Sequence, residues 1–585
     1  MKTCRSLSMA EAAVVAAATI FFFLSTTALP AAAATVEHTF VVSQMTMTHL
    51  CKKTVVTVVN GQLPGPTIEV TEGDSVIVHV VNTSPHNITI HWHGVRQLQN
   101  GWNDGVPMVT QCPIQPNQNF TYRFNVAGQV GTLWWHAHVS CLRGTLHGAI
   151  VIRPRDGTNS YPFPKPDREV PVVIGVHEDS FMLDVEPGKT YLLRIINAGL
   201  FSEYFFKVAS HRFTVVGSDA NYVTPFTTDL IVIAPGETVD ALLVADARPG
   251  KYYMVALPNQ APLPDTQTPE PATRGIVRYT TSDHHHDRLG NAGNAGKPAA
   301  VLPVMPNQHD VVQSLYFHSN LSALQHPRHR VPQVPKRVDE HMFVTLGLGT
   351  ACRHGGFKCN WDVESETGLV ATMNNISFMV PTAPLLPEHY RHVGSQLSTL
   401  VELPDKPPKV FNFTDVSLIP VGPKEKKLET TYKATLARWF RYGSAVEIVF
   451  QSTAMLQGDS NPMHLHGHDM FVLAQGAGNF DEARDVAKYN LVNPPRKNTV
   501  VVPNLGWVAV RFVADNPGVW YMHCHYEFHL AMGMTAVFIV EDGPTANTSL
   551  PPPPVGFPTC SNNEYLVPRE VSLQTPQHTV SRLMD

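Results

Sequence analysis

Short runs of aliphatic and β-branched residues, separated by turns rich in glycine and proline, recur along most of this chain. Residues 54–59, 75–81 and 190–196 are examples, and the turn between the first two reads Gly-Gln-Leu-Pro-Gly-Pro. Apolar runs of this length, bounded by glycine and proline, predict β-strands joined by tight turns. We therefore predict an all-β protein with many short strands rather than long helices.

Two breaks in this pattern divide the strand-rich sequence into three parts. Proline recurs at residues 161–166, and residues 282–335 are rich in histidine, proline, glycine and asparagine. Such compositions are typical of linkers, and His284-His-His286 fits a solvated linker better than a weak surface metal site. The sequence predicts β-sandwich or barrel units at residues 35–155, 166–281 and 336–562, a linker at 282–335 and a disordered tail at 563–585.

The N-terminus has the features of a secretory signal at residues 1–34. Lys2 and Arg5 precede an apolar run at 12–24, and Ala32-Ala-Ala34 offers a small-residue cleavage site. The apolar run is too short for a membrane anchor, and no later segment is long and apolar enough to span a bilayer. We therefore expect a secreted, extracellular protein that is not bound to a membrane.

Composition and charge narrow the range of partners. The 585 residues carry a formal net charge of −5, and 16% of them are charged. This balance gives neither the basic footprint of a nucleic-acid-binding protein nor a polybasic membrane signal. Seven Asn-x-Ser/Thr sequons add the expectation of a glycoprotein with N-glycans; they begin at Asn82, Asn87, Asn119, Asn320, Asn375, Asn412 and Asn547.

Four His-x-His pairs are the main candidates for chemistry. Side chains alternate along a strand, so both histidines of a pair point to the same face. Four such strands can bring their imidazoles together around several metal ions, and imidazole suits copper, zinc, iron and nickel. The pairs are His91-Trp-His93, His136-Ala-His138, His464-Leu-His466 and His523-Cys-His525.

The last of these pairs encloses Cys524, whose side chain points to the opposite face of a strand. His529 follows Cys524 by five residues, and Met534 follows His529 by five. Thiolate, imidazole and a weak axial methionine are parts of a blue-copper electron-transfer site, and this set is unusual for structural zinc, which is the alternative. The number of cysteines after Cys4 is odd, which leaves one thiol for such a role. We therefore predict copper at two sites that share one strand.

The sequence around these residues resembles plant laccases, from residue 36 to residue 560. The resemblance implies three consecutive cupredoxin-like domains, each a Greek-key β-sandwich or barrel, and four copper ions. The motifs that carry it are His91-Trp-His-Gly-Val-Arg-Gln, Gly101-Trp-Asn-Asp-Gly, Val109-Thr-Gln-Cys-Pro-Ile, Gly131-Thr-Leu-Trp-Trp-His-Ala-His, Pro462-Met-His-Leu-His-Gly-His and Trp520-Tyr-Met-His-Cys-His.

The same resemblance assigns ligands to each copper ion. The type 2 copper would be held by His91 and His464, the type 3 pair by His93, His136, His138, His466, His523 and His525, and the type 1 copper by Cys524, His529 and Met534. Asp104 and Glu527 match acidic positions beside the cluster, where carboxylates can relay protons. The alternative is that both acids merely hydrogen-bond nearby backbone.

The implied activity is that of a laccase, a benzenediol:oxygen oxidoreductase. Lignin precursors or lignin-derived phenols would each give one electron at type 1, and four electrons would reduce O₂ to two waters at the other three coppers. We expect a monomer of the apoplast or cell wall that acts on small phenols and O₂.

One residue departs from the laccase pattern at the type 1 copper. Where the family has His-Pro-x-His-Leu-His-Gly, this chain has Asn461-Pro-Met-His-Leu-His-Gly, and a neutral amide is a poor substitute for imidazole at copper. His468 shares a strand face with His464 and His466, so we do not expect it to replace the missing ligand. A copper-binding cell-wall protein with impaired turnover is therefore an alternative to a laccase. An ascorbate oxidase or a ferroxidase is a further alternative.

The middle domain is a second departure from the family. The chain passes from residues 171–176 almost directly to residues 181–189, where plant laccases usually carry a longer segment with a cysteine that pairs with the equivalent of Cys51. We therefore expect a shortened middle domain and no such partner for Cys51; a disulfide with Cys141 is one option. The pairs Cys112–Cys560 and Cys352–Cys359 still resemble those of the family.

Overall fold

The computed structural model describes most of the chain between residues 33 and 560. The described residues are 33–49, 52–155, 160–175, 181–260, 272–280, 299–326, 331–353, 359, 365–392, 397–418, 431–454, 460–558 and 560. Nearly all of the predicted signal sequence, Cys51, His284-His-His286 and the predicted tail lie outside these residues. In the part that is described, no helix has the length and apolar character needed to cross a membrane.

The first block of strands forms two four-stranded sheets. One has the order β2 (Lys52–Val59), β1 (Thr35–His49), β4 (Ser75–Asn82), β6 (Asn119–Asn125), and the other β3 (Ile68–Thr71), β8 (His147–Arg153), β7 (Gly131–Ala137), β5 (Ile90–His93). Along β4, Val76, Val78 and Val80 are fully buried and the residues between them are partly exposed. This alternation is what a strand with one face on a core requires.

The second block forms two five-stranded sheets. Their orders are β10 (Met182–Val185), β18 (Thr273–Tyr279), β17 (Lys251–Asn259), β12 (Glu203–Val208), β15 (Ile231–Ile233), and β14 (Asn221–Thr228), β13 (Phe213–Ser218), β16 (Thr238–Val244), β11 (Thr190–Asn197), β9 (Arg168–Ile174). β9 and β10 flank the position where plant laccases usually carry a longer segment. Each of them is the edge strand of a different sheet, so the chain changes sheets at this point.

The third block forms an eight-stranded and a six-stranded sheet. The larger has the order β23 (Tyr432–Ala434), β21 (Ile376–Phe378), β20 (Thr367–Met373), β19 (Glu340–Cys352), β25 (Ala445–Ser452), β30 (Gly506–Val513), β27 (Met470–Ala477), β28 (Arg496–Lys497), and the smaller β22 (Val401–Glu402), β24 (Leu436–Phe440), β32 (Thr535–Val540), β31 (Gly518–Cys524), β26 (Asn461–Leu465), β29 (Thr499–Val502). Apolar residues from both sheets form one continuous core. The predicted all-β architecture is therefore confirmed.

Helices are short in the described residues. The α-helices are α2 (Val311–Ser319), α3 (Leu385–Arg391), α4 (Glu482–Asp485) and α5 (Glu527–Ala531), and the 3-10 helices are η1 (Gly101–Asn103), η2 (Ser140–Gly144), η4 (Leu397–Thr399), η5 (Val416–Leu418), η7 (Val486–Lys488) and η8 (Ala546–Thr548).

The segment predicted as a linker differs from that expectation, because it contains α2. The Asp310 side chain accepts a hydrogen bond from the Val312 N–H (3.2 Å) and so caps the helix. Phe317 and Leu321 are buried in the core of the second unit. Residues 311–321 therefore pack against the sheets, because apolar side chains within this polar segment are buried there.

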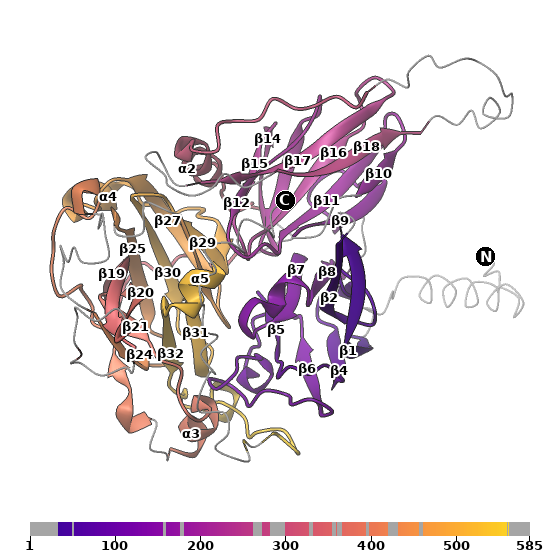
Figure 1. Ribbon diagram of the computed structural model, residues 1–585. Coiled ribbons are helices and arrows are strands. Elements are labelled where there is room, and N and C mark those ends of the chain that lie inside the picture. The colour runs from indigo at the N-terminus through magenta and orange to yellow at the C-terminus, as the bar shows by residue number, and fades with distance from the viewer. Residues whose placement is uncertain are drawn as a thin grey trace, which may run out of the picture.

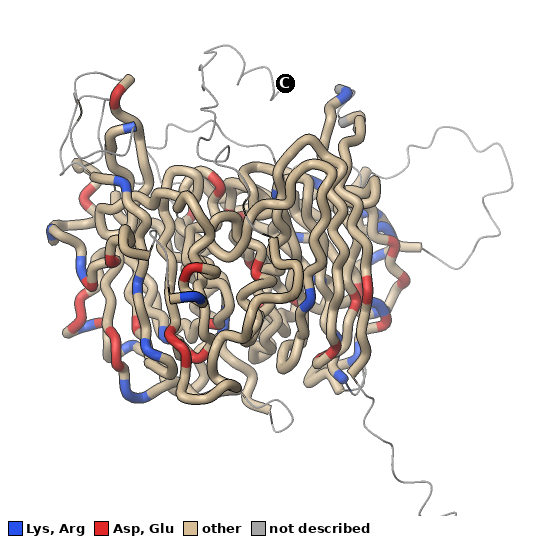
Figure 2. Tube along the Cα trace, turned by 90° about the horizontal axis from the view of Figure 1, so that it is seen from below, with Lys and Arg blue, Asp and Glu red and all other residues tan. Residues whose placement is uncertain are grey.

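The three units lie against one another, with the first in indigo to violet, the second in magenta and the third in orange to yellow (Figure 1). β5 and β7 lie on the side of the first unit that faces β31 and α5 (Figure 1). α2 contacts β15 of the second unit and β27 of the third. Figure 2 shows acidic and basic residues interspersed over the face in view.

Two predicted disulfides are confirmed. Cys112 pairs with Cys560, which ties the end of the described chain to the first unit, and Cys352 pairs with Cys359. Cys141 is exposed and not in a disulfide. The suggested disulfide between Cys51 and Cys141 is therefore not borne out, because the Cys141 thiol is free; Cys51 itself lies outside the described residues.

Candidate metal centre

Two pairs of neighbouring strands carry the four His-x-His pairs. β5 and β7 pair so that His91 lies opposite His136, and β26 and β31 pair so that His464 lies opposite His523. The first strand pair belongs to the first unit and the second to the third unit. The histidines therefore meet between two units that are hundreds of residues apart in the sequence.

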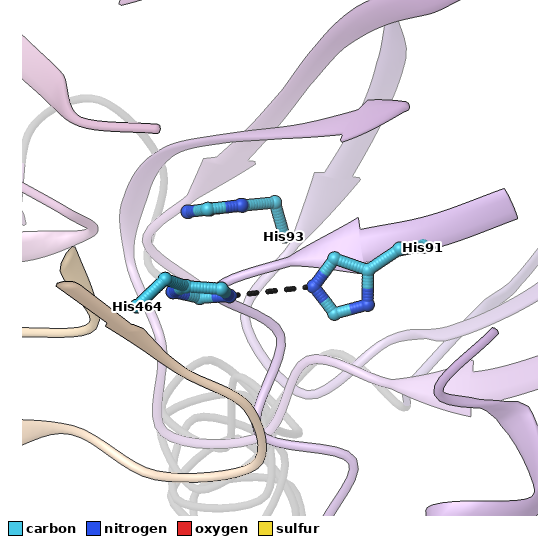
Figure 3. Close-up of side chains that lie close together, drawn as sticks. All are labelled: His91, His93 and His464. Carbon is cyan, nitrogen blue, oxygen red and sulfur yellow. Dashed lines mark hydrogen bonds between the residues drawn. The ribbon is translucent and has the colours of Figure 1, made fainter. Parts of the chain in front are cut away.

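The eight imidazoles form three groups, in each of which ring nitrogens lie within 4.8 Å of one another. The groups are His91, His93 and His464, then His93, His136 and His525, and then His138, His466 and His523. In the first group the rings of His93 and His464 are stacked, with centroids 3.7 Å apart, and His91 points at His464 (Figure 3). All eight side chains are buried.

Ring nitrogens that point away from these groups donate to hydrogen-bond acceptors. His91, His136, His464 and His523 each place Nδ1 at 2.7–2.9 Å from a backbone carbonyl oxygen. A carbonyl oxygen can only accept, so the proton of each neutral ring sits on Nδ1. Their Nε2 atoms are therefore bare lone pairs that point into the groups.

The bare nitrogens face one another at distances too short for two lone pairs alone. Nε2 of His91 lies 3.4 Å from Nε2 of His464. Nε2 of His466, a ring whose Nδ1 donates to the Asp104 carboxylate, lies 3.2 Å from Nε2 of His523. Nε2 of His138 is buried and has no hydrogen-bond partner among the described residues. Two acceptors at this distance repel one another unless a cation lies between them. Imidazoles whose second nitrogen is hydrogen-bonded are the usual ligands of protein metal sites, so the residues fit metal ions here.

Burial keeps the imidazoles in the neutral form that binds a metal. Loss of water disfavours the charged ring, and charges on neighbouring groups add to this effect. The pKa is lowered well below 6.5 in His93, His136, His138, His464, His466, His523 and His525.

Asp104 follows η1 and lies beside two of the groups. Its Oδ2 accepts a hydrogen bond from Nδ1 of His466 (2.9 Å), and its Oδ1 lies 3.4 Å from Nδ1 of His91. That Oδ1 is buried and has no hydrogen-bond partner among the described residues. Gly105 has a φ of +83°, where a side chain would collide with the carbonyl oxygen of Ile90. This turn brings the carboxylate back against the histidines of β5.

Glu527 begins α5 and reaches the histidines through Arg143. Oε2 of Glu527 lies 3.6 Å from a guanidinium nitrogen of Arg143, and both side chains are buried. Another nitrogen of Arg143 lies 2.8 Å from Nδ1 of His525. A guanidinium can only donate, so His525 presents Nδ1 as an acceptor, unlike the histidines held by carbonyls.

The Cys524 thiol faces the core of the third unit, on the other side of β31 from the histidine groups. Its Sγ lies 3.4 Å from Nδ1 of His529. Burial lowers the pKa of His529 to about 4, so this ring is neutral. Met534 is fully buried in the same core, and its backbone carbonyl accepts a hydrogen bond from the Cys524 N–H. These residues supply the thiolate, imidazole and thioether of a copper site.

Asn461 occupies the position next to this thiol. Its Oδ1 lies 3.9 Å from Sγ of Cys524. His468 is elsewhere, because its ring packs against Phe512 and Trp520. Of the two residues, the amide of Asn461 is therefore the one beside Cys524.

The residues that touch the histidines and were not expected from the sequence include Arg143, Thr499 and Gly236. Oγ1 of Thr499 lies 2.9 Å from Nε2 of His93. Gly236, from the second unit, has a φ of +97°, and a Cβ there would lie 3.0–3.1 Å from the rings of His525 and His93. No local motif marks these positions, because each contact joins distant parts of the chain.

Comparisons with known proteins agree with this geometry. Models of the multicopper oxidase family match residues 41–157, 148–282 and 402–544. Laccase-15 of Oryza sativa subsp. japonica is 61% identical over 578 residues, which cover 90% of this chain and 94% of that protein. Laccase-19 of the same subspecies is 53% identical, with 91% and 95% covered.

A solved laccase structure shares the fold. The crystal structure of the laccase from Botrytis aclada superposes with a TM-score of 0.64 at 24% identity, and 90% of each chain is covered. This chain therefore belongs to the multicopper oxidase family, among the plant laccases, with three cupredoxin-like domains and copper as its cofactor.

Proposed function

We propose that this protein is a secreted laccase that oxidises small phenols and reduces O₂ to water. One observation carries the proposal: a single strand, β31, presents Cys524 to one site and His523 to the other. A short covalent path therefore joins a site where a phenol can lose an electron to a site where O₂ can gain electrons. Copper, when bound, supplies the one-electron redox chemistry at both sites.

The surroundings of the Cys524 site and of the imidazole groups differ, which suits them to different steps of the reaction. The eight buried imidazoles lie between the first and third units, shielded from bulk water, and would hold the copper that supplies redox chemistry there. Cys524, the last residue of β31, points to the opposite face of that strand, and His529 belongs to α5, which exposes Phe528 at the surface. This division supports electron entry at the Cys524 site and O₂ reduction at the imidazole groups.

We propose that Asp104 delivers protons during O₂ reduction. Reduction of O₂ to water consumes one proton for each electron, and a buried carboxylate at hydrogen-bond distance can deliver them. Oδ1 of Asp104 is the atom without a partner among the described residues, next to His91. Glu527, beside Arg143, is the second choice.

We also propose that the protein is secreted and carries N-glycans, although not at the sequon of Asn82. Asn82 is fully buried, and its side-chain nitrogen donates to the carbonyl oxygens of His86 and Ile114. A glycan cannot attach there in the folded protein. The exposed sequon asparagines are Asn119, Asn320, Asn412 and Asn547.

Asn461 favours a second candidate, a copper-binding cell-wall protein with impaired turnover. An amide oxygen 3.9 Å from the Cys524 sulfur is a weaker ligand than an imidazole. An ascorbate oxidase or a ferroxidase would share the same imidazole groups, so only the reducing substrate separates these activities.

Oxygen uptake by the copper-loaded mature protein tests the proposed function. We expect oxygen uptake with a simple diphenol, no release of hydrogen peroxide, and loss of uptake after copper is chelated. Ascorbate and ferrous iron in the same assay separate the alternative substrates. A protein that loads copper at the imidazole groups and consumes no O₂ with a diphenol would favour impaired turnover instead.

A further inference from the structure

Thr499, the first residue of β29, touches histidines from two units. Its Oγ1 lies 2.9 Å from Nε2 of His93 and 3.2 Å from Nδ1 of His464. We propose that the Thr499 hydroxyl is a positioning residue that fixes which nitrogen of His93 faces the metal. The inference rests on the copper groups of the proposed function, but it does not depend on turnover.

The hydrogen atoms around Thr499 can be accounted for one by one. Its single hydroxyl proton goes to Oδ1 of Asn498 (3.1 Å), so the oxygen is free to accept from the two rings. His93 then carries its proton on Nε2 and presents Nδ1 as a lone pair. That Nδ1 lies 3.4 Å from Nε2 of His136, inside their shared group.

His93 is thereby turned the opposite way from its neighbours. His91, His136 and His464 donate from Nδ1 and present Nε2 to the groups. Tautomer choice in a neutral imidazole is set by the partner of the outward nitrogen. For His93 that partner is the Thr499 hydroxyl.

Thr499 is itself held by the second unit, from which no histidine enters the three groups. On one side, Thr499 pairs with His464 across β29 and β26. On the other, its backbone N–H donates to Oδ2 of Asp219 (3.2 Å). Asp219 lies 3.3 Å from the buried ammonium of Lys497, which also lies 3.0 Å from Glu237. This buried ion-pair network fixes the strand that presents the hydroxyl.

Loss of the hydroxyl should therefore weaken copper binding without removing any ligand. Thr499→Val keeps the shape of the side chain and leaves the buried Nε2–H of His93 without its acceptor. Hydrogen-bond partners of metal-binding histidines change metal affinity by about 10- to 100-fold. We expect a loss of this size at the groups that contain His93.

The experiment compares copper retention in four full-length proteins. Wild type, Thr499→Val, Thr499→Ser and Thr372→Val are loaded with copper and dialysed against graded concentrations of a chelator. Thr372 is a matched control, because it is also buried in the third unit, and its hydroxyl donates to the Gly347 carbonyl (3.2 Å) away from the histidines. Copper per chain and the EPR spectrum of bound Cu(II) are the readouts.

The inference expects weaker retention and a changed EPR spectrum only in Thr499→Val, with Thr499→Ser close to wild type. Retention and spectrum equal to wild type in Thr499→Val would overturn it. If circular dichroism shows that Thr499→Val does not fold, Thr499→Ala, which adds no bulk, takes its place with the same expected results. A wild type that binds copper without consuming O₂ would refute the laccase activity alone. A wild type that binds no copper would overturn both.

Discussion

At the scale of single residues, one proposed copper site has all of its expected ligands and the other has an amide in place of an imidazole. The imidazole groups have eight buried histidines, most with the outward nitrogen already hydrogen-bonded. The Cys524 site has His529 at 3.4 Å and an amide, Asn461, at 3.9 Å. Asn461 therefore makes the Cys524 site the less complete of the two copper sites.

Asn461→His should add a ligand beside Cys524. We expect a higher copper content, by up to about one copper per chain, a stronger blue absorption from copper–thiolate bonding, and faster phenol oxidation, because imidazole binds copper better than an amide. Copper analysis, visible spectra and oxygen uptake measure these changes. Asn461→Gln keeps an amide and is the control. Equal copper content and equal rates in Asn461→His and wild type would refute the role given to Asn461.

Asp104→Ala should slow O₂ reduction by about 100-fold or more, the usual range for losing a positioned proton donor. Reduction of the Cys524 site by a phenol should continue, because Asp104 contacts His466 and His91 on the imidazole side of β31. Stopped-flow measurements of the two half-reactions separate these steps. Asp104→Asn keeps an acceptor for His466 and tests orientation alone. Equal slowing of both half-reactions in Asp104→Ala would exclude the relay.

How far the sequence predicts the site depends on the distance between the partners along the chain. The histidines and Cys524 were found because His-x-His and His-Cys-His place their side chains by local alternation. Thr499 and Arg143 were not found, since their contacts with His93 and His525 span 406 and 382 residues. Such contacts depend on how the units pack, and no local pattern encodes that.

At the scale of elements, turns and short helices place side chains that the strands alone would not. The β-branched runs at residues 54–59, 75–81 and 190–196 are strands, as predicted, within β2, β4 and β11. The polar composition of residues 282–335 concealed α2, although Asp310 caps it in the usual way. Near the metal groups, the turn at Gly105 follows η1, lies against Ile90 of β5 and carries Asp104.

Gly105→Ala should destabilise this turn strongly. Its φ of +83° is unfavourable for alanine, and the new Cβ would also collide with the backbone oxygen of Ile90. We expect a loss of about 2–5 kcal/mol in the free energy of unfolding, combining strain with overpacking. Gly61→Ala is the control, because Gly61 has a φ of +68° with nothing within 4 Å, so only the strain remains. Similar melting temperatures for the two variants would contradict the collision.

At the scale of the whole molecule, the metal groups join the first and third units. The three-unit order was predicted from the breaks at residues 161–166 and 282–335. The ligand sets implied by the laccase resemblance, such as His91 with His464, already required the first and third units to meet. The contact of Gly236 of the second unit with these histidines was not predicted. Burial of so many imidazoles at one interface also makes the stability of the copper-free protein depend on pH.

The copper-free protein should lose stability as the pH falls below 6.5. Burial lowers the folded-state pKa of seven of these histidines well below 6.5, so the unfolded chain binds more protons in this range, and unfolding becomes easier. Each histidine contributes up to about 1.4 kcal/mol per pH unit below 6.5. His529 adds to this down to its pKa of about 4. Urea unfolding at pH 7.5, 6.5 and 5.5 measures the trend; equal free energies at 7.5 and 5.5 would contradict it.

Anomalous diffraction at the copper edge, from crystals of the copper-loaded protein, tests the central claim most directly. We predict copper peaks at the interface of the first and third units, within the groups of His91 with His464, His93 with His136 and His525, and His138 with His466 and His523. We predict a weaker peak beside Cys524, because Asn461 replaces an imidazole there. Copper-loaded crystals with no peak among these imidazoles would contradict the account.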